Sequence, residues 1–117
     1  MNITETFAHH ARAVPDRPAI IHGDTVILYR DLDPLVRRVA AHLLSLGLSQ
    51  GDVAGVALKD SVEHLVILAA LARAGIVILP LDWRCTALEQ ERVLAHFGAR
   101  RVLIEPGRPQ QIGRAHV

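Results

Sequence analysis

The sequence predicts an α/β fold in which strands and helices alternate to build a parallel sheet. Three short apolar runs, at residues 53–58, 76–79 and 101–104, have the length and composition of strands covered on both faces. Segments with helical character, residues 61–74 and 86–97, separate these runs. Strands that alternate with helices over short connections form parallel sheets with right-handed crossovers. A helix and a β-hairpin are expected ahead of this strand-helix-strand-helix-strand unit.

The first thirty residues predict that helix and that hairpin. Apolar residues recur at helical spacing over residues 3–14, with Asn2 placed to cap the helix and Glu5 placed to complete a capping box. Two β-prone runs, residues 19–22 and 25–29, then flank a central Gly-Asp pair. Such a pair between two short strands favours a tight hairpin turn.

A second helix is expected between the hairpin and the alternating unit, over residues 33–46. Its apolar side chains follow the i, i+3, i+4, i+7 pattern, which gives the helix one apolar stripe to bury. Pro34 is awkward in a helix that has already begun, because its ring would clash with a backbone carbonyl one turn earlier. We therefore place Asp33 as the N-cap and Pro34 at the first helical position, with Gly47 as the stop.

The alternating unit carries its own start and stop signals. Asp60 with Glu63 forms a capping pair before the first of its helices, and Thr86 with Glu89 forms a capping box before the second. Each helix is followed by a glycine. The first helix is apolar almost all round, so we expect it to be buried. Pro80 has no N–H to donate and should close the second strand.

Composition restricts the classes of partner. The formal net charge is +1 with both signs interspersed, which gives no basic field for nucleic acid. No apolar run reaches the length of a membrane span, and the N-terminus does not resemble a secretion signal, so a cytoplasmic location is expected. Cys85, the one cysteine, has no partner for an internal disulfide and no evident activating base nearby in sequence. The seven histidines lack ligand spacing, and we assign no metal residues.

Four motifs follow one another in order: PDRPAI, ILYRDLD, GDVAGVAL and LARAGIVILPLD. Over residues 15–105 they resemble the N-terminal portion of the AMP-forming acyl-CoA synthetases, within the superfamily of adenylate-forming ligases. ILYRDLD is similar to the first core motif of that family, and LARAGIVILPLD to the second, in which a strand ends in Pro-Leu-Asp. One departure is Leu28, where the family usually has Ser or Thr. Loss of the hydroxyl cap should lower the stability of the helix that follows by about 1 kcal/mol.

The resemblance implies a reaction that this stretch of sequence does not itself carry. Family members convert a carboxylic acid and ATP to an acyl-adenylate and pyrophosphate, and then form a thioester with CoA, with Mg²⁺ neutralising phosphate charge. The family's nucleotide loop and catalytic lysine lie further along the chain than these motifs. We therefore assign no catalytic or cofactor-binding residues here, and Lys59, the one lysine, is placed in a strand-to-helix turn. Trp83-Arg84 after Pro-Leu-Asp favours acyl-CoA ligases over peptide-synthetase adenylation domains. Arg84 is either structural or a contact to a CoA phosphate.

Two segments are distinguished along the chain. Residues 1–111 are predicted to be a partial N-terminal subdomain of an AMP-dependent synthetase or ligase, inactive by itself and lacking the remaining ligase domain. Residues 112–117, IGRAHV, match one reading frame of a widely used sequencing adapter, so we expect this segment to be non-native. The expected parent enzyme acts in fatty acid metabolism. Two alternatives remain: a stand-alone α/β module that binds a small molecule or a partner, and an adenylation domain of the peptide-synthetase type.

Overall fold

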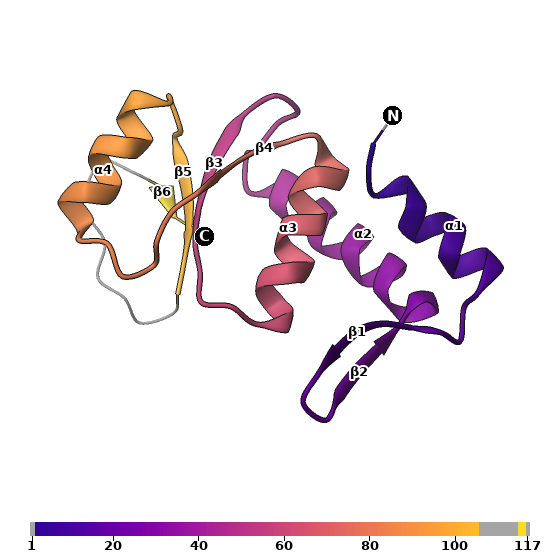
Figure 1. The fold of residues 1–117 in the computed structure, drawn as a ribbon. Coiled ribbons are helices and arrows are strands. Elements are labelled where there is room, and N and C mark those ends of the chain that lie inside the picture. Colours follow the sequence, from indigo (N-terminus) through magenta and orange to yellow (C-terminus); the bar gives the residue numbers. More distant parts are fainter. Residues whose placement is uncertain (1, 106–114, 117) are drawn as a thin grey trace.

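The computed structural model describes residues 2–105 and 115–116. Across the molecule in Figure 1, one helix covers one side of a parallel sheet, and the remaining helices and a hairpin lie on the other side. The elements in chain order are α1 (Glu5–Ala13), β1 (Pro18–His22), β2 (Thr25–Leu28), α2 (Tyr29–Ser45), β3 (Val53–Ala57), α3 (Val62–Ala74), β4 (Val77–Pro80), α4 (Ala87–His96), β5 (Arg101–Ile104) and β6 (Ala115–His116).

The predicted parallel sheet is confirmed. Its described strands lie in the order β4-β3-β5-β6, and each neighbouring pair is parallel. The chain moves from β3 to β4 on one side and then returns past β3 to β5 on the other. With right-handed crossovers this change of direction places α3 and α4 on opposite faces of the sheet, as Figure 1 shows. Pro80 pairs with Val56 at the end of β4, and the next residue, Leu81, donates its N–H to the carbonyl of Val56 at 2.9 Å, so the missing N–H of the proline costs no bond to β3.

The segment predicted to be non-native is only partly described. Ala115 and His116 form β6 and pair with Arg101 and Val102 of β5. Residues 112–114 and 117 lie outside the described residues, as do residues 106–111. The origin of this segment stays a prediction.

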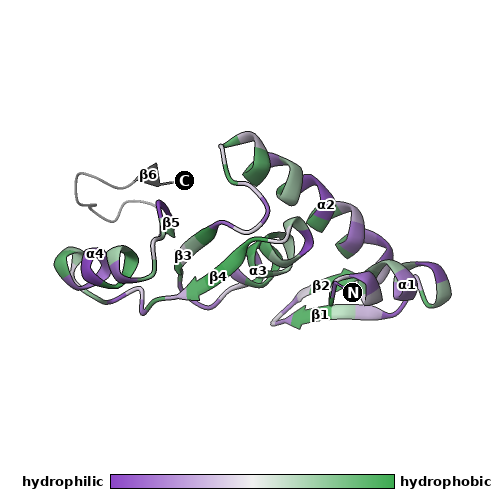
Figure 2. Ribbon diagram, turned by 90° about the horizontal axis from the view of Figure 1, so that it is seen from above, coloured by the Kyte–Doolittle hydropathy of each residue, from purple (hydrophilic) through white to green (hydrophobic). Residues whose placement is uncertain are grey.

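Both faces of β3 are covered, as its unbroken apolar run predicts. Ala54 and Val56 point to one side and join the core formed with α2 and α3. Gly55 points to the other side, where a Cβ atom would lie 2.5 Å from Leu94 of α4. Figure 2 shows the resulting concentration of apolar residues along β3, β4 and α3. The absence of a side chain at Gly55 therefore allows α4 to approach the sheet closely.

The start of α2 differs from the prediction. The helix begins at Tyr29, and Pro34 lies inside it rather than at its first position. The first two helical N–H groups are satisfied by the preceding loop: Tyr29 donates to the carbonyl of Arg17 at 3.0 Å, and Arg30 donates to that of Pro15 at 3.1 Å. Leu28 is the N-cap and makes no side-chain cap, as its apolar side chain predicts. Backbone carbonyls from the loop thus replace the missing cap, and the helix tolerates the one hydrogen bond that proline removes.

Asp33 consequently serves as a tertiary contact and not as a cap. It is buried, with 7% of its surface exposed, and Oδ1 accepts a hydrogen bond from Nη2 of Arg73 at 2.6 Å. Arg73 also donates from Nε to the hydroxyl of Thr4 at 2.7 Å and from Nη2 to its carbonyl at 3.1 Å. This network joins α2, α3 and the segment just before α1.

The helix starts of α1 and α3 also correct the sequence-based caps. Glu5 opens α1, whose N-cap is Thr4 without a side-chain cap, and the Asn2 carboxamide binds Thr4 instead. In α3 the N-cap is Ser61, whose hydroxyl accepts from the N–H of His64 at 3.1 Å, so the expected pairing of the neighbouring acid with Glu63 is wrong. Asp60 and Ser61 are neighbours and both are of a type that caps helices, but Ser61 is the residue at the helix start, with the extended backbone that a cap needs.

Other predicted features are confirmed. β1 and β2 form an antiparallel hairpin, and α1 ends before Pro15. The hydroxyl of Thr86 caps α4 by accepting from the N–H of Glu89 at 3.2 Å, and it donates to that residue's carboxylate at 2.9 Å. Gly75 follows α3 in the left-handed conformation, with φ 74°. Leu65 of α3, by contrast, is 52% exposed, so this helix is not buried all round as its sequence predicts. Within the described residues, none of the helices has the length and apolar character needed to cross a membrane.

Candidate functional site

Polar and aromatic side chains gather where the three longer parallel strands end. Lys59 follows β3, Asp82, Trp83 and Arg84 follow β4, and Glu105 follows β5. Because β4, β3 and β5 are adjacent and parallel, their carboxyl ends lie along one edge of the sheet. In open α/β sheets this edge is where ligands bind. We call these five residues the strand-end cluster.

Two contacts tie the three strand ends together. The backbone N–H of Lys59 donates to Oε2 of Glu105 at 2.7 Å, which joins the ends of β3 and β5. The ammonium group of Lys59 lies 4.6 Å from the centroid of the Trp83 ring, which joins the ends of β3 and β4 through a cation–π interaction. Lys59 is therefore positioned by its neighbours on both sides, and its charge lies over the aromatic face.

Asp82 organises the turn after β4. Oδ1 accepts from the backbone N–H of Arg84 at 2.9 Å and from its Nε at 3.1 Å, and Oδ2 accepts from Nη2 at 3.0 Å. These bonds form a bidentate carboxylate–guanidinium pair, which fixes the plane of the guanidinium group. The hydrogen bonds that Arg84 donates to Asp82, together with the negative charge of that carboxylate, raise the pKa of Arg84. The Arg84 guanidinium group is therefore a permanent cation, and its side chain is 72% exposed.

The cluster offers two fixed cations on an exposed edge. Lys59 and Arg84 are anchored by an aromatic ring and by a carboxylate, respectively, and anchored cations are suited to binding phosphate groups. From the sequence alone no site residues are assigned, and Lys59 and Arg84 are considered separately. The signal that was available is a polar residue directly after the first and third predicted strands, at Lys59 and Glu105, and an acid in the turn after the second, at Asp82. Only the order of the strands brings these residues together.

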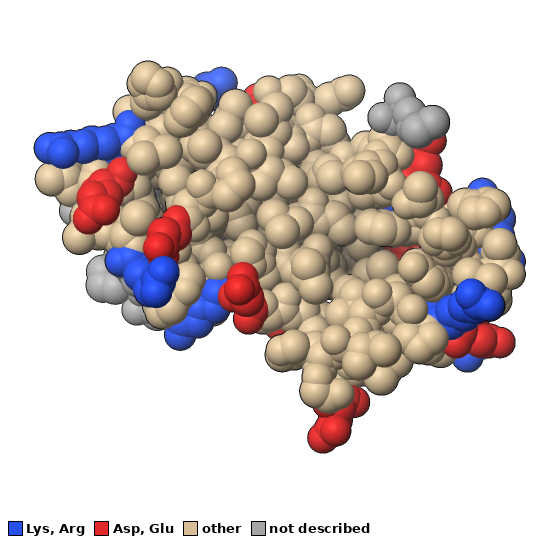
Figure 3. All heavy atoms as spheres, in the orientation of Figure 1, with Lys and Arg blue, Asp and Glu red and all other residues tan. Residues whose placement is uncertain are grey.

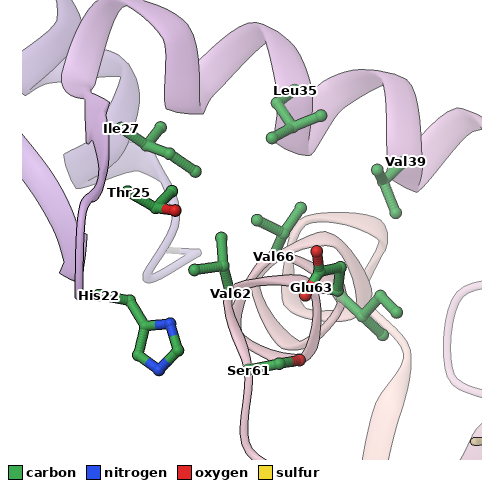
Figure 4. Close-up of a pocket in the computed structure, with 10 residues that line it drawn as sticks. His22, Thr25, Ile27, Leu35, Val39, Ser61, Val62, Glu63 and Val66 are labelled. Atoms are coloured by element: carbon green, nitrogen blue, oxygen red, sulfur yellow. The ribbon is translucent and has the colours of Figure 1, made fainter.

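A second feature is an apolar groove between the hairpin and helices α2 and α3. It encloses about 620 Å³. Figure 4 shows Ile27 from the hairpin, Leu35 and Val39 from α2, and Val62 and Val66 from α3 around this space. Much of the face shown in Figure 3 is uncharged in its middle, and charged side chains lie mainly toward the two ends.

The described residues do not by themselves fit a Mg²⁺ site or the phosphate loop of a nucleotide site. They contain no group of three or more potential metal ligands. The glycines at positions 47, 51 and 55 are not followed by the Lys-Ser/Thr pair of a phosphate loop.

Comparison with known proteins identifies the scaffold. A family model described as AMP-binding enzyme matches residues 7–116, which is nearly the whole chain. The chain belongs to the AMP-binding enzyme family. The resemblance of the four motifs to adenylate-forming enzymes is thereby confirmed. The strand-end cluster and the apolar groove both lie within the residues that the family model matches.

The relatives include several kinds of ligase. The chain is 38% identical over 95 residues to phosphinothricin tripeptide synthetase PhsC of Streptomyces viridochromogenes, covering 81% of this chain and 9% of that protein. It is 31% identical over 84 residues to a medium/long-chain-fatty-acid–CoA/3-oxocholest-4-en-26-oate–CoA ligase of Mycobacterium marinum, covering 72% and 15%. The chain thus spans a small fraction of the length of these curated relatives.

A solved relative has the same fold. The N-terminal subdomain of NpsA from Klebsiella oxytoca, in complex with anthranilyl-AMSN, superimposes with a TM-score of 0.88 at 27% sequence identity. The match covers 99% of this chain and 30% of that one. The α/β arrangement predicted from the sequence is therefore that of the N-terminal subdomain in this family.

Proposed function

We propose that this chain is the N-terminal scaffold of an AMP-forming acyl-CoA synthetase, which activates a carboxylic acid with ATP and passes the acyl group to CoA. The family match supports ATP-dependent activation of an acid. The choice of CoA as acceptor is supported by Trp83-Arg84 after the Pro-Leu-Asp turn, the pair that favours acyl-CoA ligases. The observation that carries the proposal is the bidentate Asp82–Arg84 pair, which holds a cation outward at the carboxyl edge of the sheet.

In this proposal the chain positions groups and does not perform the chemistry. Lys59 and Arg84 supply positive charge at the strand ends, where phosphate groups of a substrate would be stabilised. Mg²⁺ would be held by residues of the remaining ligase domain, since the described residues form no metal site. We further propose that the parent enzyme is cytoplasmic.

A peptide-synthetase adenylation domain is the second candidate, favoured by the likeness to the tripeptide synthetase. The stand-alone binding module is less well supported. The chain corresponds to a small share of each matched ligase, which favours a part of a larger enzyme; large apolar side chains exposed singly at separate places are ordinary and do not decide the question. The exposed residues are Ile3, Ile21, Val26, Leu44, Leu65, Val77, Leu88 and Phe97.

The test uses the uninterrupted parent protein beside the 117-residue chain. The parent should catalyse acid-dependent ATP–pyrophosphate exchange and form an acyl-CoA, whereas the chain alone should do neither. In the parent, Arg84→Ala should raise the KM for CoA and leave the exchange rate unchanged. Arg92→Ala, an exposed arginine on α4 away from the cluster, serves as the matched control.

Three results would contradict the proposal. The first is acyl transfer only to a carrier-protein phosphopantetheine, which would favour the peptide-synthetase type. The second is an equal effect of Arg84→Ala on exchange and on CoA transfer. The third is a stable, monodisperse chain that binds an acyl ligand tightly by itself, which would favour the stand-alone module.

A further inference from the structure

Four arginines surround one hollow on the side of the molecule formed by α1, α2 and α3. The hollow has a volume of about 430 Å³ and lies between α1 and the first half of α2. Three other lining residues have small apolar side chains, which offer no hydrogen-bonding groups. These three residues are Ala8, Ala11 and Pro34, and the arginines are Arg12, Arg30, Arg37 and Arg73.

Only one carboxylate, that of Asp33, lines the hollow beside these four guanidinium groups. It is already held by Arg73 at 2.6 Å, and its side chain is 10% exposed. Arg37 approaches the other carboxylate oxygen only to 3.6 Å, which is longer than a hydrogen bond. The positive charge around the hollow is therefore not balanced by the residues that line it.

The remaining arginines are free to reorient. Arg30 pairs with Asp16 at 3.1 Å, but both side chains are more than half exposed, and such surface pairs contribute little. Arg12 makes no ion pair or hydrogen bond with any residue in the described part of the chain. Arg37 is 64% exposed. These three side chains can turn toward a ligand at little cost, while Arg73 is fixed at the base by Thr4.

We propose that this hollow binds a small, multiply charged phosphate anion, such as pyrophosphate or the phosphate chain of a nucleotide. Guanidinium groups bind phosphate oxygens in a bidentate manner, and several of them together favour a multivalent anion over a monocarboxylate. A hollow of this volume has room for on the order of ten water molecules at about 30 Å³ each, which is sufficient for two or three phosphate groups. The site lies on helices remote from the strand-end cluster, and it does not depend on the proposed function.

The test is an amide NMR titration of the 117-residue chain in phosphate-free buffer of low ionic strength. Inorganic phosphate, pyrophosphate and ATP are titrated separately. Pyrophosphate should cause saturable shifts in α1 and the first half of α2, bind more tightly than inorganic phosphate, and weaken as salt is added. Binding of ATP with an affinity similar to that of pyrophosphate assigns recognition to the phosphate chain. Binding of ATP without binding of pyrophosphate overturns the assignment.

Two exposed arginines provide a matched pair of variants. Arg37→Gln should weaken pyrophosphate binding by roughly tenfold, because it removes a charge-assisted contact. Arg38→Gln removes the same charge from the next residue, which does not line the hollow, and should leave binding within about twofold, since a distant surface charge acts only through a screened field. Equal weakening by both variants would show a general charge effect and would refute the site. So would shifts centred on the strand-end cluster, or no saturable shifts with any of the three anions. Circular dichroism verifies that each variant is folded.

Discussion

Replacing Gly55 with alanine is expected to destabilise the protein through a steric conflict between the sheet and α4. The new Cβ would lie 2.5 Å from Cδ2 of Leu94, 3.2 Å from Leu81 and 3.3 Å from Val102. Carbon atoms in contact ordinarily lie about 3.5–4.0 Å apart, so the contact with Leu94 is about 1 Å too short. Leu94 is only 2% exposed and has little space into which to move.

The expected magnitude follows from two opposing terms. Forcing an extra carbon into a filled core costs about 1–3 kcal/mol. Alanine also restricts the unfolded chain more than glycine does, which offsets about 0.4–1 kcal/mol of that cost. Gly55 does not have a positive φ, so backbone strain adds nothing. The free energy of unfolding should therefore fall by about 1–2 kcal/mol.

Urea unfolding followed by circular dichroism measures this loss, and a double-mutant cycle identifies its cause. Leu94→Ala alone should cost about 2–5 kcal/mol by leaving a cavity. In the double variant the new methyl group occupies part of that cavity, so the combined cost should be smaller than the sum by at least about 0.5 kcal/mol. Gly23→Ala, where a Cβ meets no atom within 4 Å, should be additive with Leu94→Ala. Additivity of the Gly55 and Leu94 changes would refute the steric explanation.

Two further predictions concern the charged contacts. Asp33→Ala should lower the free energy of unfolding by about 3 kcal/mol, because it leaves the half-buried Arg73 without its carboxylate partner. The control is Asp31→Ala, which removes an exposed acid from the same helix and should cost less than about 1 kcal/mol. Equal losses in the two variants would contradict a stabilising buried pair. Lys59→Met should change the fluorescence of Trp83, the one tryptophan, and cost about 0.5–1 kcal/mol; an unchanged emission spectrum would show that the ammonium does not lie over the ring.

The features that were predicted correctly from the sequence depend on neighbouring residues. The capping box of Thr86 and Glu89 involves a hydroxyl and an N–H three residues apart, so its geometry is fixed as soon as the helix forms. Gly75 ends α3 because the left-handed backbone there suits glycine. The order of strands and helices likewise follows from the alternation of short apolar runs with helical spacing.

The wrong start predicted for α2 has a tertiary cause. The N–H groups that begin α2 can be satisfied by any nearby acceptor, and the fold supplies carbonyls of the loop at Pro15 and Arg17. Asp33, which the sequence predicts as the N-cap, is therefore not needed at the helix start and pairs instead with Arg73, 40 residues away. A contact of that separation leaves no local pattern in the sequence.

The amino-acid sequence determined the family fold, the alternation of strands and helices, and the residues at which the helices stop, because these features depend on spacing along the chain. The tertiary structure decided which residues share a site. Lys59, Trp83 and Glu105 meet only because β3 lies between β4 and β5, and the four arginines meet only because α1, α2 and α3 pack side by side. Strand order and helix packing are set by the burial of apolar surface over the whole chain, which no single segment encodes.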